Sequence, residues 1–142
     1  MAVEVKLLPR ADVTVHEEVA RMVEETMKKY GRIDILVNNV NLGPYILKPF
    51  ERLTWNDLSQ KLHDEMKAAF NVTKEVIPIM KKQHYGSIIY IATASAKHPV
   101  PPGAIIAGTS KAALVAFAKY IAQEFGRESP FFLMNLDKKL IL

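Results

Sequence analysis

The sequence predicts an α/β protein, built on an incomplete doubly wound parallel sheet of three to four strands with flanking helices. Two observations predict this class. Short apolar runs rich in β-branched residues alternate with longer segments of helical periodicity, and the connections between successive runs are long enough to hold a crossover helix. Such connections are right-handed and pack helices on the sheet. We assign residues 1–126 to one partial domain and leave residues 127–142 as an unassigned tail.

Three segments have the pattern of strands. Residues 3–8 alternate apolar and other side chains and end at Pro9. Residues 33–37 (IDILV) and 87–93 (SIIYIAT) are mostly apolar, which is typical of parallel strands covered on both faces. A short strand also fits FFLMNL in the tail, but no helix or turn pattern follows it there.

Helical periodicity fills the connections. Thr14 and Glu17 have the spacing of a capping box, before a helix that we expect to end at Gly31. Thr54 followed by Asp57 predicts the start of the next helix in the same way. Two segments then carry the remaining helical stripes of apolar residues: 62–82 and 104–125.

Composition excludes several classes of protein. Of the 142 residues, 49% are hydrophobic and 24% charged, as in a soluble globular domain. No apolar run approaches the ~20 residues of a bilayer span, the start lacks a secretory signal, and cysteine is absent. We therefore expect a cytoplasmic protein without disulfides and without membrane association.

The net charge of +4 is not a nucleic-acid signature. The 19 basic residues are dispersed, and the densest groups lie where helices are expected to end, where positive charge complements the helix dipole. No nucleic-acid recognition motif accompanies them. We expect no nucleic-acid partner and no metal site.

Four segments occur in the order and at about the spacings seen in short-chain dehydrogenases/reductases. They are ADVT (11–14), ILVNNVN (35–41), FNVTKEVIPIM (70–80) and PGAIIAGTSKAAL (102–114). The chain resembles this family over residues 3–126. The resemblance implies a Rossmann-like sheet and hydride transfer between the nicotinamide of NAD or NADP and a carbonyl or alcohol.

The resemblance also implies a cofactor site at the carboxyl ends of the strands. Its candidate residues are Asp12, Val13, Asn38, Asn39, Val40 and Lys111. Asp12 would lie beside the adenine ring, and Lys111 would hold the nicotinamide ribose. Asn41 stands where the family has a glycine, so its side chain would crowd the nicotinamide side of the site.

Most of the family's catalytic side chains are replaced. The proton-carrying tyrosine should stand four residues before Lys111, at Ala107, and the asparagine that holds a relay water falls at Glu65. A methyl group cannot exchange a proton, and acid-base assistance is typically worth ~10²–10⁴ in rate. We therefore expect little or no activity from this chain.

Hydroxyl groups near the family's serine position are the remaining candidates. That position is Ala94, with Thr93 and Ser95 on either side. Either hydroxyl is a candidate to replace the serine, so the candidate catalytic residues are Lys111, Ser95 and Thr93. A family member also begins with a Gly-rich turn that receives the pyrophosphate. No such turn precedes Asp12, so we expect weak or no dinucleotide binding.

Two further hypotheses remain open. The chain could be a non-catalytic binding or regulatory partner of a complete family member, or a truncated gene product. Segments 60–82 and 104–125 match the helices through which family members dimerise. Small residues on the second segment permit close helix contact, so we also expect a homo-oligomer, although a helix that faces the core would look similar.

Overall fold

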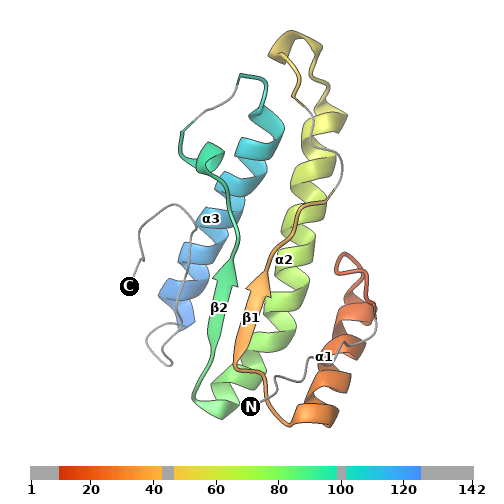
Figure 1. Ribbon diagram of the computed structural model, residues 1–142, viewed down its shortest axis with the longest axis vertical. Coiled ribbons are helices and arrows are strands. Elements are labelled where there is room, and N and C mark those ends of the chain that lie inside the picture. The colour runs from red at the N-terminus through yellow and green to blue at the C-terminus, as the bar shows by residue number, and fades with distance from the viewer. Residues whose placement is uncertain (1–9, 43–46, 99–101, 126–142) are drawn as a thin grey trace, which may run out of the picture.

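The computed structural model describes residues 10–42, 47–98 and 102–125 (Figure 1). Its helices and strands, in chain order, are α1 (His16–Tyr30), β1 (Ile35–Asn38), α2 (Trp55–Gln83), β2 (Ser87–Tyr90) and α3 (Ile105–Phe125). Two short 3-10 helices, η1 (Phe50–Arg52) and η2 (Ala94–Ala96), lie in the connections. This order confirms the predicted α/β class. The predicted strand at 3–8 and the tail at 127–142 lie outside the described residues.

The sheet is parallel, as predicted. β1 and β2 pair from Ile35↔Ser87 to Asn38↔Tyr90, and α2 is the crossover between them. The described part of the sheet therefore holds two of the three to four strands that the sequence predicts. Each strand is shorter than its predicted segment, and both end at the same edge of the sheet.

One face of the sheet carries the core. Ile88 and Tyr90 of β2 are buried in a cluster with Leu114 of α3 and with side chains of α1 and α2. On the opposite face, Ile35 is 61% and Val37 is 53% exposed. Successive side chains of a strand point to opposite faces, and the described helices join the core on one face only. The prediction that the 33–37 strand is covered on both faces is therefore wrong for this part of the chain.

The capping box predicted at Thr14 is also wrong. α1 begins one residue later than that box requires, with Val15 as an N-cap that makes no side-chain cap. The Thr14 hydroxyl instead donates to Asp12 Oδ1 over 2.7 Å, and the same oxygen accepts from the Thr14 amide. The predicted end is confirmed, because Gly31 has the left-handed conformation, with φ of 74°, that closes the helix.

The capping box at Thr54 is confirmed. The Thr54 hydroxyl accepts from the Asp57 amide, and the Asp57 carboxylate accepts from the Thr54 amide. The Lys48 ammonium group, 2.5 Å from Asp57 Oδ2, and then the Thr54 amide hold the pKa of Asp57 down to about 2. α2 runs from this cap through 29 residues without interruption. Within the segment 62–82 for which an apolar stripe was predicted, Phe70 is 47% exposed.

Helix α3 packs as a core helix. Ile106, Leu114 and Ala118 are buried in one stripe, and its largest contact is with α2. By length and composition alone α3 could cross a membrane; the core helix of a soluble protein passes the same test, and 33% of the apolar window of α3 is buried here. Its buried stripe also includes Ser110 and Lys111, and a buried lysine needs a partner.

Removing the N-terminal cap of α2 should lower the free energy of unfolding more than disturbing the turn before α1 does. We expect Thr54→Ala to lower the free energy of unfolding by about 1 kcal/mol, because it leaves an amide of the first helical turn without its acceptor. Thr14→Ala is the matched control, since its hydroxyl contacts no helix amide, and it should cost less than half as much. Urea unfolding followed by circular dichroism measures both. Equal losses would contradict the assignment of the two caps.

Candidate functional site

The segment that follows β1 lies against both long helices. Asn38 ends β1, and Val40, two residues later, accepts a hydrogen bond from the Nζ of Lys111 on α3. The structure thus brings together two of the residues for which the family resemblance implies a cofactor role. Lys111 is only 6% exposed, so its ammonium group acts inside the protein and not on a solvated helix surface.

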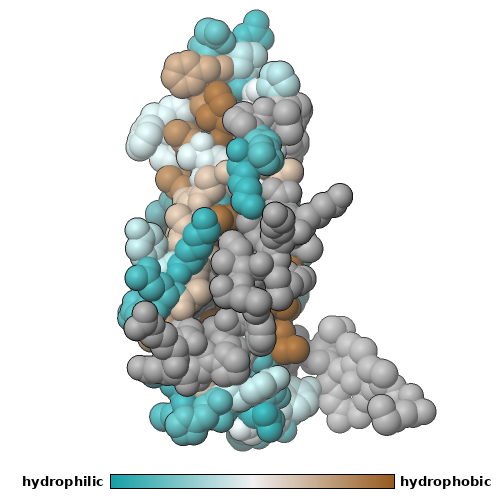
Figure 2. Space-filling model, turned by 90° about the vertical axis from the view of Figure 1, so that its left-hand side faces the viewer, coloured by the Kyte–Doolittle hydropathy of each residue, from teal (hydrophilic) through white to brown (hydrophobic). Residues whose placement is uncertain are grey.

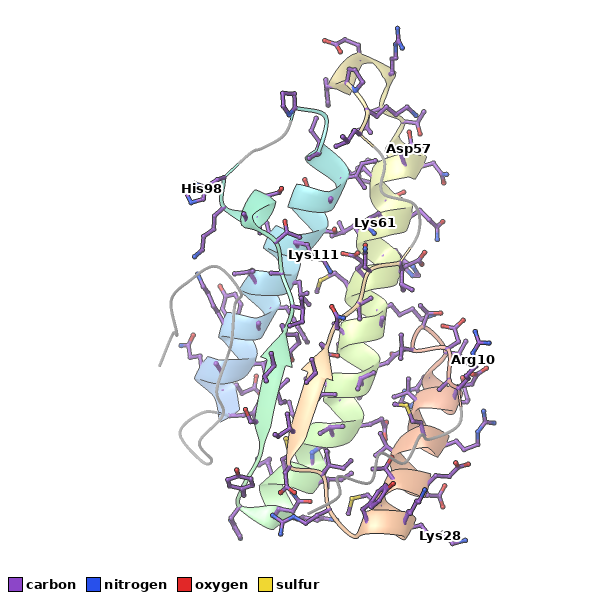
Figure 3. All side chains as sticks on the ribbon, in the orientation of Figure 1. Arg10, Lys28, Asp57, Lys61, His98 and Lys111 are labelled. Carbon is purple, nitrogen blue, oxygen red and sulfur yellow. The ribbon has the colours of Figure 1, made fainter. Side chains whose placement is uncertain are left out.

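Glu65 supplies the buried negative charge that Lys111 needs. This carboxylate on α2 is 0% exposed. Its Oε1 lies 2.8 Å from the Nζ of Lys61, and its Oε2 lies 3.5 Å from the Nζ of Lys111. Neither oxygen receives a well-aligned hydrogen bond from the described residues, so charge attraction dominates both contacts. Figure 3 shows Lys61 and Lys111 extending from their two helices toward the space between them.

Lys61 extends the cluster to the segment after β1. Its Nζ donates to Asn41 Oδ1 over 2.9 Å and to the carbonyl oxygen of Leu42. Lys61 is 7% exposed. Sequence reasoning missed this residue, because a lysine four residues before a glutamate is common on a solvated helix surface. One feature of the sequence could have indicated that Lys61 is buried. Glu65 lies on the apolar stripe of α2, and Lys61 lies one helical turn before it.

Burial and the charges of the cluster have opposing effects on the pKa of Lys111. Burial lowers the pKa of Lys111, and the Glu65 carboxylate works in the opposite direction. Lys61 adds a second positive charge that lowers the pKa of Lys111 further. The cluster therefore holds two ammonium groups against one carboxylate, and backbone and amide oxygens of residues 40–42 complete the coordination of the positive charge.

A second buried polar chain lies at the carboxyl ends of the strands. The hydroxyl of Tyr90 on β2 is 2.8 Å from Thr73 Oγ1, and Asn38 Nδ2 donates to the same Thr73 oxygen over 3.3 Å. Burial raises the pKa of Tyr90 to about 12, so its phenol keeps its proton near neutral pH. This hydroxyl contacts Thr73 in the core, and it belongs to β2, not to the Ala107 position of α3 where the resemblance implies a phenol.

Asp12, predicted to lie beside the adenine, and its neighbour Val13 precede α1 and contact a different part of α2. Asn71 Nδ2 donates to the carbonyl oxygen of Val13 over 3.1 Å. Asp12 is exposed, and hydrogen bonds from the side chain and then the backbone of Thr14 lower its pKa. Asn71 stands six residues after Glu65, about 9 Å along a helix axis. The described contacts thus connect the Asp12–Val13 turn to α2, away from the Lys111 cluster.

Thr93 and Ser95 shape the connection after β2. Thr93 Oγ1 accepts a hydrogen bond from the Ser95 amide over 3.0 Å and caps η2. This short helix packs so closely on α3 that a Cβ at Gly108 would lie 3.0 Å from the Ser95 carbonyl oxygen. The Thr93 oxygen is used as a local cap, and the catalytic role implied for either residue stays a prediction.

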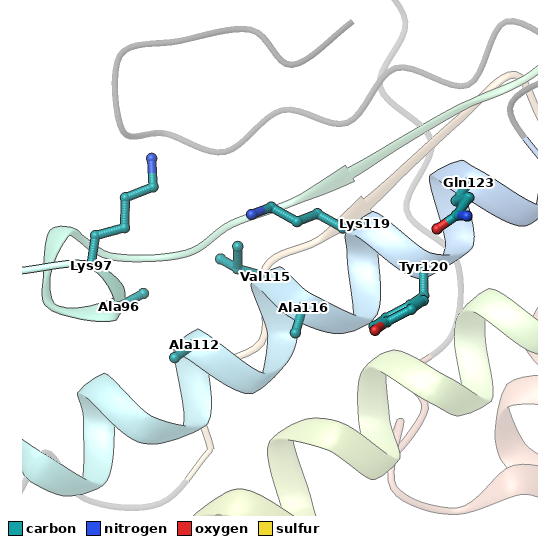
Figure 4. A pocket seen from close by; sticks show the side chains of 8 residues that line it. All are labelled: Ala96, Lys97, Ala112, Val115, Ala116, Lys119, Tyr120 and Gln123. Atoms are coloured by element: carbon teal, nitrogen blue, oxygen red, sulfur yellow. The ribbon is translucent and has the colours of Figure 1, made fainter.

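The outer face of α3 carries an open groove of about 430 Å³ (Figure 4). Its walls are Ala96, Lys97, Ala112, Val115, Ala116, Lys119, Tyr120 and Gln123. Figure 2, which views the molecule from the α3 side, shows hydrophobic and neutral residues along this side between hydrophilic groups. Lys111 does not line this groove, because it lies on the buried stripe of the helix.

Comparison with known proteins adds to this geometry. A family model described as enoyl-(acyl carrier protein) reductase matches residues 2–129. The 3-oxoacyl-[acyl-carrier-protein] reductase FabG of Thermotoga maritima is 34% identical over 113 residues, which is 80% of this chain and 45% of that protein.

Solved structures match the fold as well. An NAD⁺-bound xylitol dehydrogenase has a TM-score of 0.76 and 30% identity, and the match covers 88% of this chain and 47% of that one. A Burkholderia xenovorans structure described as a short-chain dehydrogenase/reductase has a TM-score of 0.79 and 27% identity, over 88% and 48% of the two chains. The chain thus spans about half the length of the relatives that it matches.

The Tyr90 hydroxyl should contribute to stability in a pH-dependent way. We expect Tyr90→Phe to lower the free energy of unfolding by about 1 kcal/mol at pH 8, since it removes a buried hydrogen bond to Thr73. Above the ordinary tyrosine pKa of about 10, the unfolded chain loses this proton while the folded chain retains it until about pH 12. The stability of the original protein therefore falls with pH over that window.

The variant lacks this contribution, so its deficit should shrink by about 1 kcal/mol at pH 11. Urea unfolding at pH 8 and pH 11 measures the difference. Tyr120→Phe, which alters an exposed tyrosine, is the control and should change neither value. A Tyr90→Phe deficit that is the same at both pH values would contradict the buried phenol.

Proposed function

Since the chain belongs to the short-chain dehydrogenase/reductase family, we propose that it is a nicotinamide-linked oxidoreductase unit with little or no hydride-transfer activity of its own. The observation that carries this proposal is the state of Lys111. Its ammonium group pairs with Glu65 and donates to Val40, and α3 has a methyl group at Ala107 where the family's proton carrier would stand.

The residues present fit the nicotinamide end of a dinucleotide in part. An ammonium group has three N–H donors, and among the described residues one of them donates to Val40, so Lys111 keeps donor capacity for a ribose hydroxyl beside its ion pair with Glu65. Asn41 is held by Lys61, which fixes a side chain on the side of the site where the family has none. NAD or NADP is the class of cofactor that this site would take, as the NAD⁺-bound xylitol dehydrogenase relative supports.

The missing step is proton transfer. When bound, a nicotinamide supplies or accepts a hydride at the carbonyl carbon, and a proton must then move at the substrate oxygen. Tyr90 cannot carry that proton, because its hydroxyl contacts Thr73 and its pKa is raised to about 12. The remaining role of the chain in this proposal is therefore to bind and position the cofactor, with Lys111 as the group that binds its ribose.

Turnover measurements test the proposed inactivity. We expect oxidation of NADH or NADPH with a panel of aldehydes and ketones to stay at the buffer rate, because the loss of acid-base assistance costs ~10²–10⁴ in rate. Absorbance at 340 nm follows the reaction, with a full-length relative measured in parallel as the positive control. Turnover well above the buffer rate that disappears in Lys111→Ala would overturn the proposal.

A second proposal concerns self-association through α2 and α3. An apolar groove of about 460 Å³ runs between these helices, and a second of about 520 Å³ continues it toward the start of α2. Phe70 and Phe117 line both grooves, and Trp55 and Phe70 are exposed. A contiguous apolar face of this kind marks an interaction surface, and a second copy of the chain is the partner we propose for it.

A charge at the centre of this face should prevent association. We expect the original protein to be a dimer at tens of micromolar and Phe70→Glu to be a monomer, because the variant would bury a carboxylate without a partner. Size-exclusion chromatography with light scattering measures the mass. Tyr30→Glu, at an exposed tyrosine of α1, is the control and should remain dimeric. A monomeric original protein, or a dimeric Phe70→Glu, would contradict the proposal.

A further inference from the structure

The two lysines of the buried cluster use their donors differently. Lys61 has three partners, Glu65 Oε1, Asn41 Oδ1 and the Leu42 carbonyl oxygen. Two of these contacts are hydrogen bonds, and the contact with Glu65 is an ion pair without a well-aligned hydrogen bond. Lys111 has two partners, Glu65 Oε2 and the Val40 carbonyl oxygen. Among the described residues, Lys61 thus donates two hydrogen bonds and Lys111 donates one, so Lys111 has more donor capacity left.

Together the two lysines contact three consecutive residues. The Nζ of Lys111 donates a hydrogen bond to Val40, and the Nζ of Lys61 donates to Asn41 and Leu42. Glu65 joins the lysines from the middle, because it stands four residues after Lys61 on α2 and faces Lys111 on α3. One carboxylate therefore connects two helices and the segment that follows β1.

We propose that Lys61 and Glu65 are positioning residues that form a charge clamp on residues 40–42, and that the clamp orients Lys111 so that donor capacity of its ammonium group remains for a ligand. Lys61 fixes the backbone, Glu65 anchors both ammonium groups, and Lys111 is the group left to touch a ligand. The inference rests on the proposed function only where it places a dinucleotide beside Lys111. The contacts of the clamp require no ligand.

The first test replaces Lys61. Lys61→Met retains much of the aliphatic stem and leaves Glu65 paired with Lys111 alone, so the buried charges balance and the fold persists. Without the clamp, the backbone amides of Asn41 and Leu42 should change from rigid to flexible. Their ¹⁵N order parameters should fall from about 0.85 to below about 0.6, while those of Ile88 and Ile89 in β2 stay unchanged.

Lys67→Met is the matched control for this measurement. Lys67 is an exposed lysine of the same helix, and its replacement should leave every order parameter of residues 40–42 as it was. A merely stabilising Lys61 would lower the midpoint of unfolding without this local change. Unchanged order parameters at Asn41 and Leu42 in Lys61→Met would overturn the clamp.

The second test removes the anchor and measures Lys111. Glu65→Gln keeps the size of the side chain and removes its charge. Without that charge, a larger fraction of Lys111 is the neutral and nucleophilic amine. We expect the acetylation of Lys111 by a small amine reagent to become at least about 5-fold faster relative to Lys67 in the same sample. Peptide mass spectrometry resolves the two sites.

The outcomes separate the clamp from the proposed function. An unchanged Lys111 to Lys67 ratio in a folded Glu65→Gln variant would overturn the role of Glu65. If that variant does not fold, the Lys61→Met measurement decides the proposal by itself. Both readouts are made without a dinucleotide, so a failure of cofactor binding or of the turnover experiment would leave them intact.

Discussion

A single buried carboxylate constrains much of this structure. Glu65 has no solvent exposure, and an ionised carboxylate that leaves water without a partner loses several kcal/mol of solvation. The chain meets this requirement from two directions, with Lys61 on the same helix and Lys111 on α3. Because each ammonium group has donors to spare, carbonyl oxygens of the segment after β1 join the cluster. The spacing of α2 and α3 and the position of residues 40–42 are thus coupled through one charge.

Local patterns in the sequence predicted helix ends correctly where no neighbouring side chain offers a rival hydrogen-bond acceptor. Gly31 and Thr54 end and begin helices as predicted, because each pattern has one stable local solution. Thr14 has the same spacing to Glu17 and fails, because Asp12 stands two residues earlier and engages both the hydroxyl and the amide of Thr14. A capping pattern states which bonds are possible, and the competing side chain decides which of them forms.

The packing of the strands shows the limit of local information more clearly. The apolar runs predicted both described strands and their parallel pairing. They also predicted cover on both faces, whereas Ile35 and Val37 are exposed in the described part. An apolar side chain in a sequence indicates a preference for burial, but it does not show which other element packs against it. The buried cluster had the same limit, because Lys61 and Glu65 form a helical pair whose burial depends on α3, more than forty residues away.

The resemblance implies an amide at the position of Glu65, and the carboxylate there is consistent with the proposed separation of binding from chemistry. A neutral amide would leave Lys111 free to respond to a neighbouring phenol, as the family resemblance implies for the complete set of residues. A carboxylate favours the charged form of Lys111, and Glu65 Oε2 lies 3.5 Å from its Nζ. With Ala107 at the position that the resemblance assigns to the phenol, this change would remove little, since no proton carrier would depend on the lysine. The cluster contacts all three residues of the segment 40–42, which agrees with the proposal that this site keeps its shape without proton transfer.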